Sequence, residues 1–365
     1  MEILEAVQHR SIASNGITLH AAILGTGPLV VLCHGFPGLW YSWRHQLPAL
    51  AAAGYKAVAL DMRGYGRSDR PLDADSYDSN QQIADVLGLL DALGEEKAIF
   101  IGHDFGAALV CNLAVRVPER VTAIAVMSCP YDFDLSGRSG AGSKPPEPHE
   151  KYHNLAFASP FSRPSECFAR IARRHFIHLH YFQAVGPADR ELGENTREFL
   201  RRIFWALSTR GKLLGWENFP SDGTGYLDVL AEPDIPLPWD WLSQGEFDYY
   251  VDEYTRTGAQ TACIGGLNSY RIADRNWEIG AEYADATIEL PCLFISGELD
   301  PVLQMIDPNA LDIMRQRCPG LQGIEIIPGA GHFVQMEQPA ATNQALLDFL
   351  GVVKLSGASS VGRHP

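Results

Sequence analysis

The chain has 365 residues, of which 46% are hydrophobic, and this is enough for a large core in one domain with a substantial insertion. A net charge of −15 argues against nucleic acid and anionic membrane surfaces as partners. The seven cysteines are scattered, odd in number and without a C-x-x-C pair, so we expect reduced, mostly buried thiols in a cytoplasmic protein. The first residues lack the pattern of a secretory signal, and no apolar run reaches the length of a membrane span.

Up to residue 131, short apolar runs alternate with helical patterns. Asn15-Gly16 lies between two β-like runs and predicts a hairpin. Apolar runs of this length between helices indicate a parallel sheet that is covered on both faces. We expect strands over 29–33, 57–60, 98–101 and 121–126, and helices over 40–53, 81–93 and 107–114.

The alternation then stops, and it resumes near the C-terminal end. Residues 136–148 are rich in Gly, Ser and Pro and predict a mobile connection. Ser243 and Glu246 form a capping-box pattern that opens a helix through Tyr254. Strands over 292–296 and 323–327 and a closing helix over 340–350 follow. We therefore expect an α/β core over 1–131 and 287–355, a mainly helical lid over 132–286, and a disordered tail over 356–365.

The pentapeptide Gly102-His103-Asp104-Phe105-Gly106 follows a predicted strand and precedes a predicted helix. This is the layout of a nucleophile elbow, in which small flanking residues allow a strained central backbone. The central residue is Asp104 rather than serine or cysteine. A carboxylate is already ionised at neutral pH, so it can attack an electrophilic carbon directly. The product would be an alkyl ester on the enzyme, which water must then hydrolyse.

Two residues follow the late strands where partners of the nucleophile are needed. Asp300 comes after the strand ending at residue 296, and His332 after the strand ending at residue 327. The order nucleophile, acid, histidine is that of α/β-hydrolases, and the strand ends meet at one edge of the sheet. His332 would deprotonate water while Asp300 orients its ring. Asp132 and Asp134, and less strongly Glu298, could supply the acid in place of Asp300.

These motifs resemble those of the soluble epoxide hydrolases of the α/β-hydrolase fold. The resemblance implies a mostly parallel eight-stranded sheet with an inserted helical lid, and it covers most of the core and two segments of the lid. The matching segments are His34-Gly35-Phe36-Pro37, Arg63-Gly64-Tyr65-Gly66-Arg67-Ser68, the elbow, the Asp300 and His332 loops, His180-Tyr181-Phe182-Gln183 with Gly186 and Ala188, Leu267-Asn268-Ser269-Tyr270-Arg271, and Arg275-Asn276-Trp277.

The resemblance also implies roles for individual residues. Tyr181 and Tyr270 would be the ring-opening acids. The bond between Phe36 and Pro37 would be cis, and the backbone amides of Phe36 and Phe105 would form the oxyanion hole. The partners would be a small hydrophobic epoxide and water, with no cofactor, and a homodimer is left open.

The chemistry of an epoxide agrees with phenols in the lid. Ring opening releases an alkoxide, a strong base that leaves poorly without a proton or hydrogen bonds. A phenol, with a pKa of about 10, can donate while it is itself un-ionised at neutral pH. Two phenols could hold the oxygen while Asp104 attacks the carbon behind it, and hydrolysis would then release a vicinal diol.

Two more functions remain open. A dehalogenase shares the aspartate-histidine-aspartate arrangement, but its halide needs donors such as indole N–H groups and no proton. In haloalkane dehalogenases a tryptophan typically follows the nucleophile, whereas the ring of Phe105 cannot donate. A ligand-binding protein that has lost catalysis is the third possibility, and the complete set of catalytic residue types argues against it.

Three histidines, His175, His178 and His180, could suggest a metal site. Their spacing matches neither one face of a helix nor one face of a strand. We expect them to have surface or lid roles, and we assign no metal.

Overall fold

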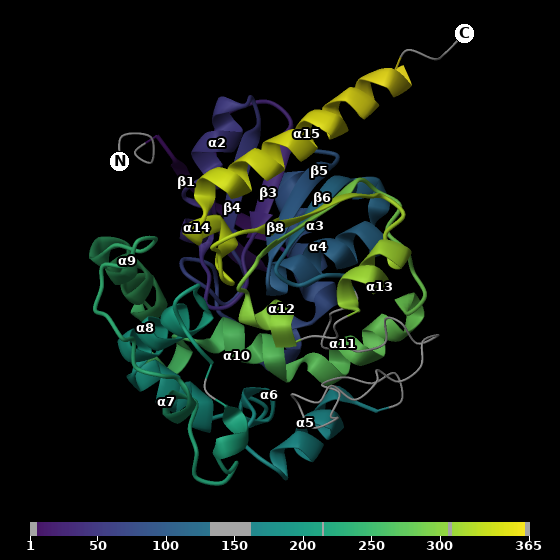
Figure 1. Ribbon diagram of the computed structural model, residues 1–365. Coiled ribbons are helices and arrows are strands. Elements are labelled where there is room, and N and C mark those ends of the chain that lie inside the picture. Colours follow the sequence, from purple (N-terminus) through teal and green to yellow (C-terminus); the bar gives the residue numbers. More distant parts are fainter. Residues whose placement is uncertain (1–5, 132–161, 214, 306–308, 362–365) are drawn as a thin grey trace.

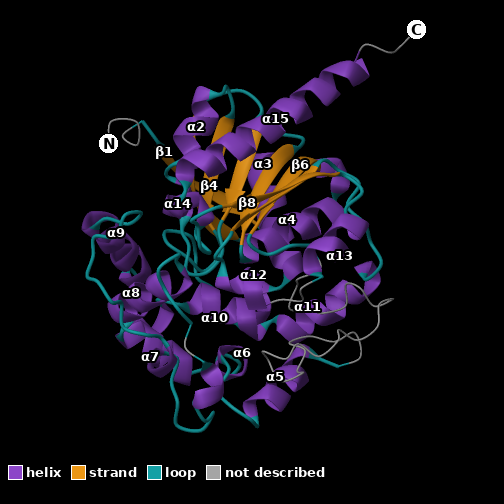
Figure 2. Ribbon diagram, in the orientation of Figure 1, coloured by secondary structure: helices purple, strands orange, loops and turns teal. Residues whose placement is uncertain are grey.

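The structure is a computed structural model that describes residues 6–131, 162–213, 215–305 and 309–361. Its centre is one eight-stranded sheet in the order β1-β2-β4-β3-β5-β6-β7-β8. Figure 2 shows this sheet in orange, with helices around it. Strand β2 is antiparallel to β1 and β4, and the other neighbours are parallel, which confirms the predicted sheet. The strands are β1 (Gln8–Ser14), β2 (Ile17–Leu24), β3 (Leu29–Cys33), β4 (Lys56–Asp61), β5 (Ala98–His103), β6 (Val121–Met127), β7 (Cys292–Gly297) and β8 (Leu321–Ile327).

The predicted hairpin at Asn15-Gly16 joins β1 to β2. Ser14 pairs with Ile17, so the loop contains two residues. Asn15 and Gly16 have φ values of 47° and 76°. A type I′ turn requires positive φ at both positions, and Asn-Gly adopts it with little strain. The hairpin prediction is therefore confirmed.

Helices cover both faces of the sheet, and strand residues alternate between two cores. In β3, Val31 packs with α3 and α4, whereas Val30 packs in the opposite core with α2 and α15. The central strands are apolar along their length because both of their faces are buried. The helices of this α/β core are α2 (Gln46–Ala52), α3 (Ser79–Leu93), α4 (Phe105–Arg116), α12 (Pro301–Met305), α13 (Ala310–Arg317), α14 (Val334–Glu337) and α15 (Pro339–Val361).

The chain between β6 and β7 forms a second, helical layer, which we call the lid helices. Figure 1 shows them gathered on one side of the sheet. They are α5 (Pro164–Ala172), α6 (His178–Tyr181), α7 (Pro187–Glu194), α8 (Thr196–Leu207), α9 (Gln244–Thr255), α10 (Ile264–Arg271) and α11 (Ala273–Gly280). The predicted capping box at Ser243 is present at the start of α9. The predicted extent of the lid, 132–286, stays a prediction, because residues 132–161 and the expected connection at 136–148 lie outside the described residues.

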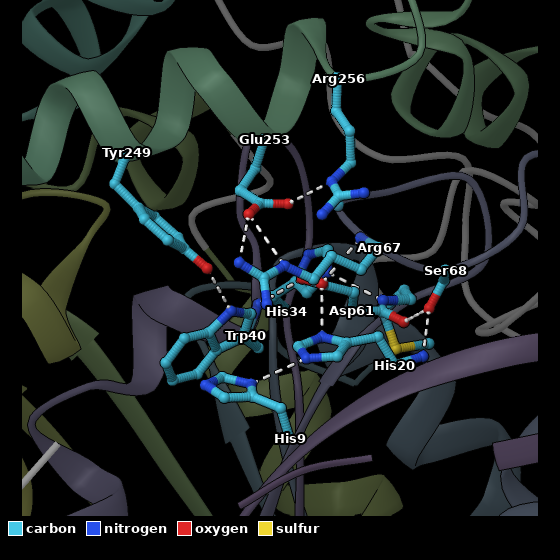
Figure 3. Close-up of polar contacts among 12 residues, drawn as sticks. His9, His20, His34, Trp40, Asp61, Arg67, Ser68, Tyr249, Glu253 and Arg256 are labelled. Carbon is cyan, nitrogen blue, oxygen red and sulfur yellow. Dashed lines mark hydrogen bonds and ion pairs between the residues drawn. The ribbon is translucent and has the colours of Figure 1, made fainter. Parts of the chain in front are cut away.

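Polar contacts fasten α9 to the α/β core (Figure 3). Arg67, in the loop after β4, donates through Nε and Nη2 to Glu253 of α9 at 2.9 and 2.7 Å. The indole of Trp40 donates to the hydroxyl of Tyr249 at 2.7 Å. Beneath them, the buried Asp61 carboxylate accepts hydrogen bonds from the backbone of Trp40 and Arg67. The loops after β3 and β4 therefore hold α9 in place through these hydrogen bonds and the ion pair between Arg67 and Glu253.

Two element boundaries differ from the prediction. The helix expected over 40–53 is divided into a 3-10 turn, Trp40–Trp43, and α2. Pro48 explains the division, because it lacks an N–H and would clash with the carbonyl four residues earlier in a continuous helix. The last helix, α15, continues to Val361, so the backbone of residues 356–361 is helical where a disordered tail was expected. Once α15 has formed against the sheet, each added residue gains a hydrogen bond at small entropic cost.

All seven cysteines lie within the described ranges as buried thiols. In those same ranges, no helix combines the length and the apolar character that crossing a membrane would require.

Candidate active site

Asp104 sits at the turn between β5 and α4, and its backbone has φ 56° and ψ −119°. Such a conformation is strained for a residue with a side chain. The two glycines of the pentapeptide allow the backbone of the turn to lie very close to neighbouring backbone. A Cβ atom on Gly102 would lie 2.1 Å from the carbonyl oxygen of Gly106, and one on Gly106 would lie 2.1 Å from that of Cys33. The sequence pattern therefore produces a sharp turn that presents Asp104.

The two oxygens of the Asp104 carboxylate have different surroundings. Oδ1 accepts a hydrogen bond of 2.8 Å from the amide of Phe36, and the amide of Phe105 also donates to this carboxylate. The bond between Phe36 and Pro37 is cis, as expected. Burial raises the pKa of Asp104 above its usual value, although His332 and the two amides act in the opposite direction.

His332 lies between two carboxylates. Its Nε2 is 3.8 Å from Oδ2 of Asp104, and its Nδ1 is 3.2 Å from Oδ1 of Asp300. Burial would lower the pKa of His332, but the carboxylates of Asp300 and Asp104 outweigh it and raise that pKa. Asp300 is fully buried, and the amide of Val302 donates to it at 2.8 Å. Burial opposes ionisation of Asp300, yet His332 and these hydrogen bonds lower its pKa below the usual value.

The structure thus brings Asp104, His332 and Asp300 together from the ends of β5, β8 and β7. Glu298, the weaker candidate for the acid, is exposed, and it accepts a hydrogen bond of 3.4 Å from the amide of Gly329. The candidates Asp132 and Asp134 lie outside the described residues.

Glu337 supports the His332 loop, and no sequence motif pointed to it. One of its carboxylate oxygens accepts from the amides of Gly331 and Thr209 at 3.1 and 2.8 Å. The other accepts from the amide of Phe333 at 3.1 Å. A single buried carboxylate therefore holds both neighbours of His332 and also Thr209, which follows α8. No local pattern could reveal this, because Thr209 is 128 positions away in the sequence.

The backbone of His332 makes further contacts. His103 and the hydroxyl of Ser128 both bind the carbonyl oxygen of His332, at 2.8 and 3.0 Å. The amide of His332 donates to the carbonyl of Leu207 at 2.9 Å. His34 binds the carbonyl of Gly35 through Nδ1 and accepts from the amide of Met62 through Nε2. His34 and His103 therefore fix loops.

A cavity of about 180 Å³ opens above Asp104, between the sheet and the lid helices. His332 and Tyr270 border it beside Asp104. Most of its wall is apolar, and a polar end lies between α3, α4 and α11. The apolar wall includes Phe36, Phe105, Leu109, Leu179, Phe182, Ile203, Leu207, Leu213, Trp216, Val302 and Met305, and the polar end includes Ser79, Gln82, Asn112 and Asn276.

Tyr270 reaches this cavity from α10, which lies between the sheet and α6 (Figure 1). Its ring packs edge-on against Phe105, with 4.9 Å between the ring centroids. Burial, and then the charge of Asp104, raise the pKa of Tyr270 well above its usual value, so the phenol stays neutral. The next residue, Arg271, forms an ion pair of 2.6 Å with Asp189 of α7, which fixes the end of α10.

Tyr181 does not reach the cavity. Its hydroxyl donates to Glu191 of α7 at 2.9 Å, and Tyr181 is absent from the described residues that line the cavity. Glu191 also accepts from the amides of Tyr226 and Leu227, both at 3.0 Å. The structure therefore makes Tyr181 part of a lid-internal polar cluster, and it does not support the ring-opening role that the resemblance implied.

The residue of α6 that lines the cavity is His178. His178 lies one turn before Tyr181 and packs against Tyr270, with 5.5 Å between ring centroids. Burial lowers the pKa of His178 to about 3, so the imidazole is neutral at physiological pH. Among the described residues, no three His, Cys, Asp or Glu side chains are grouped so that they could hold a metal ion.

The chain is similar in sequence to known proteins. A family model described as alpha/beta hydrolase fold matches residues 28–155. Epoxide hydrolase A of Mycobacterium tuberculosis is 38% identical over 353 residues, covering 96% of this chain and 99% of that protein. Epoxide hydrolase 2 of Siraitia grosvenorii is 30% identical, covering 95% and 99%.

Solved structures are similar over the same extent. Epoxide hydrolase A from Mycobacterium thermoresistibile has a TM-score of 0.78 and 40% identity, covering 94% of this chain and 98% of that one. An epoxide hydrolase from an endophytic Streptomyces has a TM-score of 0.81 and 37% identity, covering 96% and 97%.

Proposed function

The chain belongs to the epoxide hydrolase family of the α/β-hydrolase fold, and we propose that it converts an epoxide to a vicinal diol through an ester on Asp104. One observation carries this proposal. Asp104 has one oxygen bonded to a backbone amide and the other 3.8 Å from His332, at the floor of a cavity that Tyr270 also borders. Since the cavity wall is mostly apolar, the substrate is a small hydrophobic epoxide.

In the first step, Oδ2 of Asp104 attacks a ring carbon. A lone pair of Oδ2 forms the new carbon–oxygen bond, and the electrons of the broken ring bond pass to the epoxide oxygen. The amide of Phe36 holds Oδ1 and so orients the carboxylate. The neutral phenol of Tyr270 donates its proton to the epoxide oxygen. The product is a hydroxyalkyl ester on Asp104.

The second step uses the change in charge that the first step makes. Esterification removes the negative charge of Asp104, which is one of the groups that raise the pKa of His332. The pKa of His332 therefore falls, and the neutral base form is favoured. His332 takes a proton from water, which attacks the carboxyl carbon of Asp104, while Asp300 stabilises the imidazolium. The amides of Phe36 and Phe105 stabilise the oxyanion that forms on Oδ1. The intermediate then collapses: the bond between the carboxyl carbon and Oδ2 breaks, the imidazolium of His332 gives its proton to the departing oxygen, and the diol leaves. Asp104 is a carboxylate again, with one oxygen from the water.

A dehalogenase is the second candidate, because one indole borders the cavity. The Nε1 atom of Trp216 is buried and has no hydrogen-bond partner among the described residues, so it could donate to a halide. A halide site also needs a donor beside the nucleophile, and Phe105 supplies none through its side chain. Epoxide opening is therefore the function that the site supports better.

A panel assay separates the candidates. Purified protein is incubated with aryl and alkyl epoxides and with haloalkanes, and Asp104→Ala serves as the control. We expect diol formation that the variant abolishes. Halide release without diol would favour the dehalogenase, and tight binding of both classes without turnover would favour a ligand-binding protein.

A further inference from the structure

The resemblance implied that α6 contributes Tyr181 to the cavity, whereas in the structure His178 is the residue of α6 that faces it along with Leu179. The imidazole lines the cavity and meets the ring of Tyr270 edge-on, at an interplanar angle of 87°. Its Nδ1 is buried without a hydrogen-bond partner among the described residues. A buried polar side chain without a partner is destabilising unless a ligand completes its hydrogen bonds. The open space beside this ring is the cavity above Asp104.

We propose that the ring N–H of His178 is the second hydrogen-bond donor to the epoxide oxygen, next to the hydroxyl of Tyr270. This inference rests on the proposed epoxide hydrolysis and adds a catalytic residue to it. The oxygen would lie between an imidazole from α6 and a phenol from α10, while Asp104 attacks from the sheet. Tyr181 then has a different task, since its hydroxyl is bonded to Glu191.

The protonation state of His178 determines what it can do. Only burial acts on its pKa, which falls to about 3, and no charged side chain counteracts this among the described residues. The neutral ring has one N–H, which can stabilise developing negative charge as a hydrogen-bond donor. The proton that the alkoxide needs comes from Tyr270, and solvent later restores it to the phenolate. His178 keeps its proton throughout the reaction.

Two neighbours of His178 could also donate. The indole of Trp216 packs against His178 at 4.9 Å, and the phenol of Tyr226 at 5.6 Å, measured between ring centroids. Both also line the cavity. Of these three rings, only His178 packs directly against Tyr270 within the described part of the chain, which places its ring nearest to the first donor.

The test separates donation from packing. His178→Gln keeps an N–H donor in a neutral side chain, and His178→Leu has none. The rate of ester formation on Asp104 is measured in single turnovers of styrene oxide, by rapid quench and mass spectrometry. We expect His178→Leu to slow ester formation about 100-fold, as loss of one preorganised donor does, and His178→Gln to slow it less than about 10-fold. Hydrolysis of the ester should change little in either variant.

A second readout concerns the leaving group. The alkoxide of trifluoropropylene oxide is less basic than that of propylene oxide, so it depends less on hydrogen bonds. The loss in His178→Leu should therefore be smaller with the fluorinated epoxide. Three results would overturn the inference. The rate of ester formation in His178→Leu could fall equally with both epoxides, it could fall as much in His178→Gln as in His178→Leu, or it could stay within about 3-fold of wild type in His178→Leu.

Control variants identify the donor. Tyr181→Phe should form the ester at nearly the wild-type rate. A 100-fold loss in Trp216→Phe or Tyr226→Phe, with little loss in His178→Leu, would assign the role to that neighbour instead. If the wild-type protein forms no ester on Asp104 with any epoxide, the proposed function fails. If the wild-type protein forms the ester and the His178 variants form it at the same rate, this inference alone fails.

Discussion

Replacing Glu337 tests how the His332 loop is held. In the wild-type protein, one oxygen of Glu337 accepts from the amides of Gly331 and Thr209 and from the hydroxyl of Thr209, and the other accepts from the amide of Phe333. Glu337→Ala would leave these three amides without their acceptor. At about 1 kcal/mol for each amide, the free energy of unfolding falls by about 3 kcal/mol. Burial raises the pKa of Glu337, so removal of the buried carboxylate offsets part of this loss.

Glu337→Gln is the sharper variant. The amide group of glutamine keeps one acceptor oxygen, which can serve Gly331 and Thr209, but its NH₂ group then faces the amide of Phe333. Two donor groups, the Phe333 amide and the glutamine NH₂ group, then lack an acceptor, so we expect a loss of about 2 kcal/mol, smaller than that of the alanine variant. Urea unfolding measures both variants, and Glu325→Ala, at an exposed position, should change stability by less than about 0.5 kcal/mol.

Two results would refute this reasoning. One is a Glu337→Ala protein whose stability lies within the range of the Glu325→Ala control. The other is equal destabilisation by the Gln and Ala substitutions, because the geometry requires the alanine variant to lose more acceptors.

Two further predictions concern the reaction. Tyr270→Phe should slow ester formation about 100-fold or more in single-turnover measurements. Tyr181→Phe should leave that rate nearly unchanged and should lower the free energy of unfolding by about 1 kcal/mol, because the hydrogen bond to Glu191 is lost. The reverse pattern would assign the acid role to Tyr181. Asp300→Asn should move the acid limb of the pH–rate profile of ester hydrolysis to lower pH. Hydrolysis needs the neutral ring of His332, whose fraction grows as pH rises through its pKa, and the Asp300 charge raises that pKa. An unshifted acid limb would contradict the pairing of Asp300 with His332.

Much of the fold could be predicted because its determinants are local. Apolar runs between helical patterns predicted the parallel sheet, and Asn15-Gly16 predicted the hairpin. The same local reasoning predicted that Asp104, Asp300 and His332 lie together, since each follows a strand that ends at one edge of the sheet. The errors at residues 40–53 and at the C-terminal helix concern boundaries, where a single proline or the extension of an existing helix decides the outcome.

The lid part of the site was harder to predict because it depends on distant partners. His178 and Tyr181 lie on one short helix, and the sequence does not state which of them faces the cavity. Glu191 decides this by accepting the Tyr181 hydroxyl, and Tyr270 and Trp216 form the other side. The three-histidine pattern was considered only as a metal site, so the separate environment of His178 was missed. The cytoplasmic location and a homodimer stay predictions.

The central claim is a covalent ester on Asp104 that His332 helps water to hydrolyse. His332→Gln protein, mixed with an excess of a reactive epoxide and analysed by mass spectrometry, tests it most directly. The account predicts that the peptide containing Asp104 gains the mass of one epoxide and that this adduct persists, while Asp104→Ala shows none. An unmodified Asp104 peptide in a His332→Gln protein that still consumes epoxide would contradict the two-step mechanism.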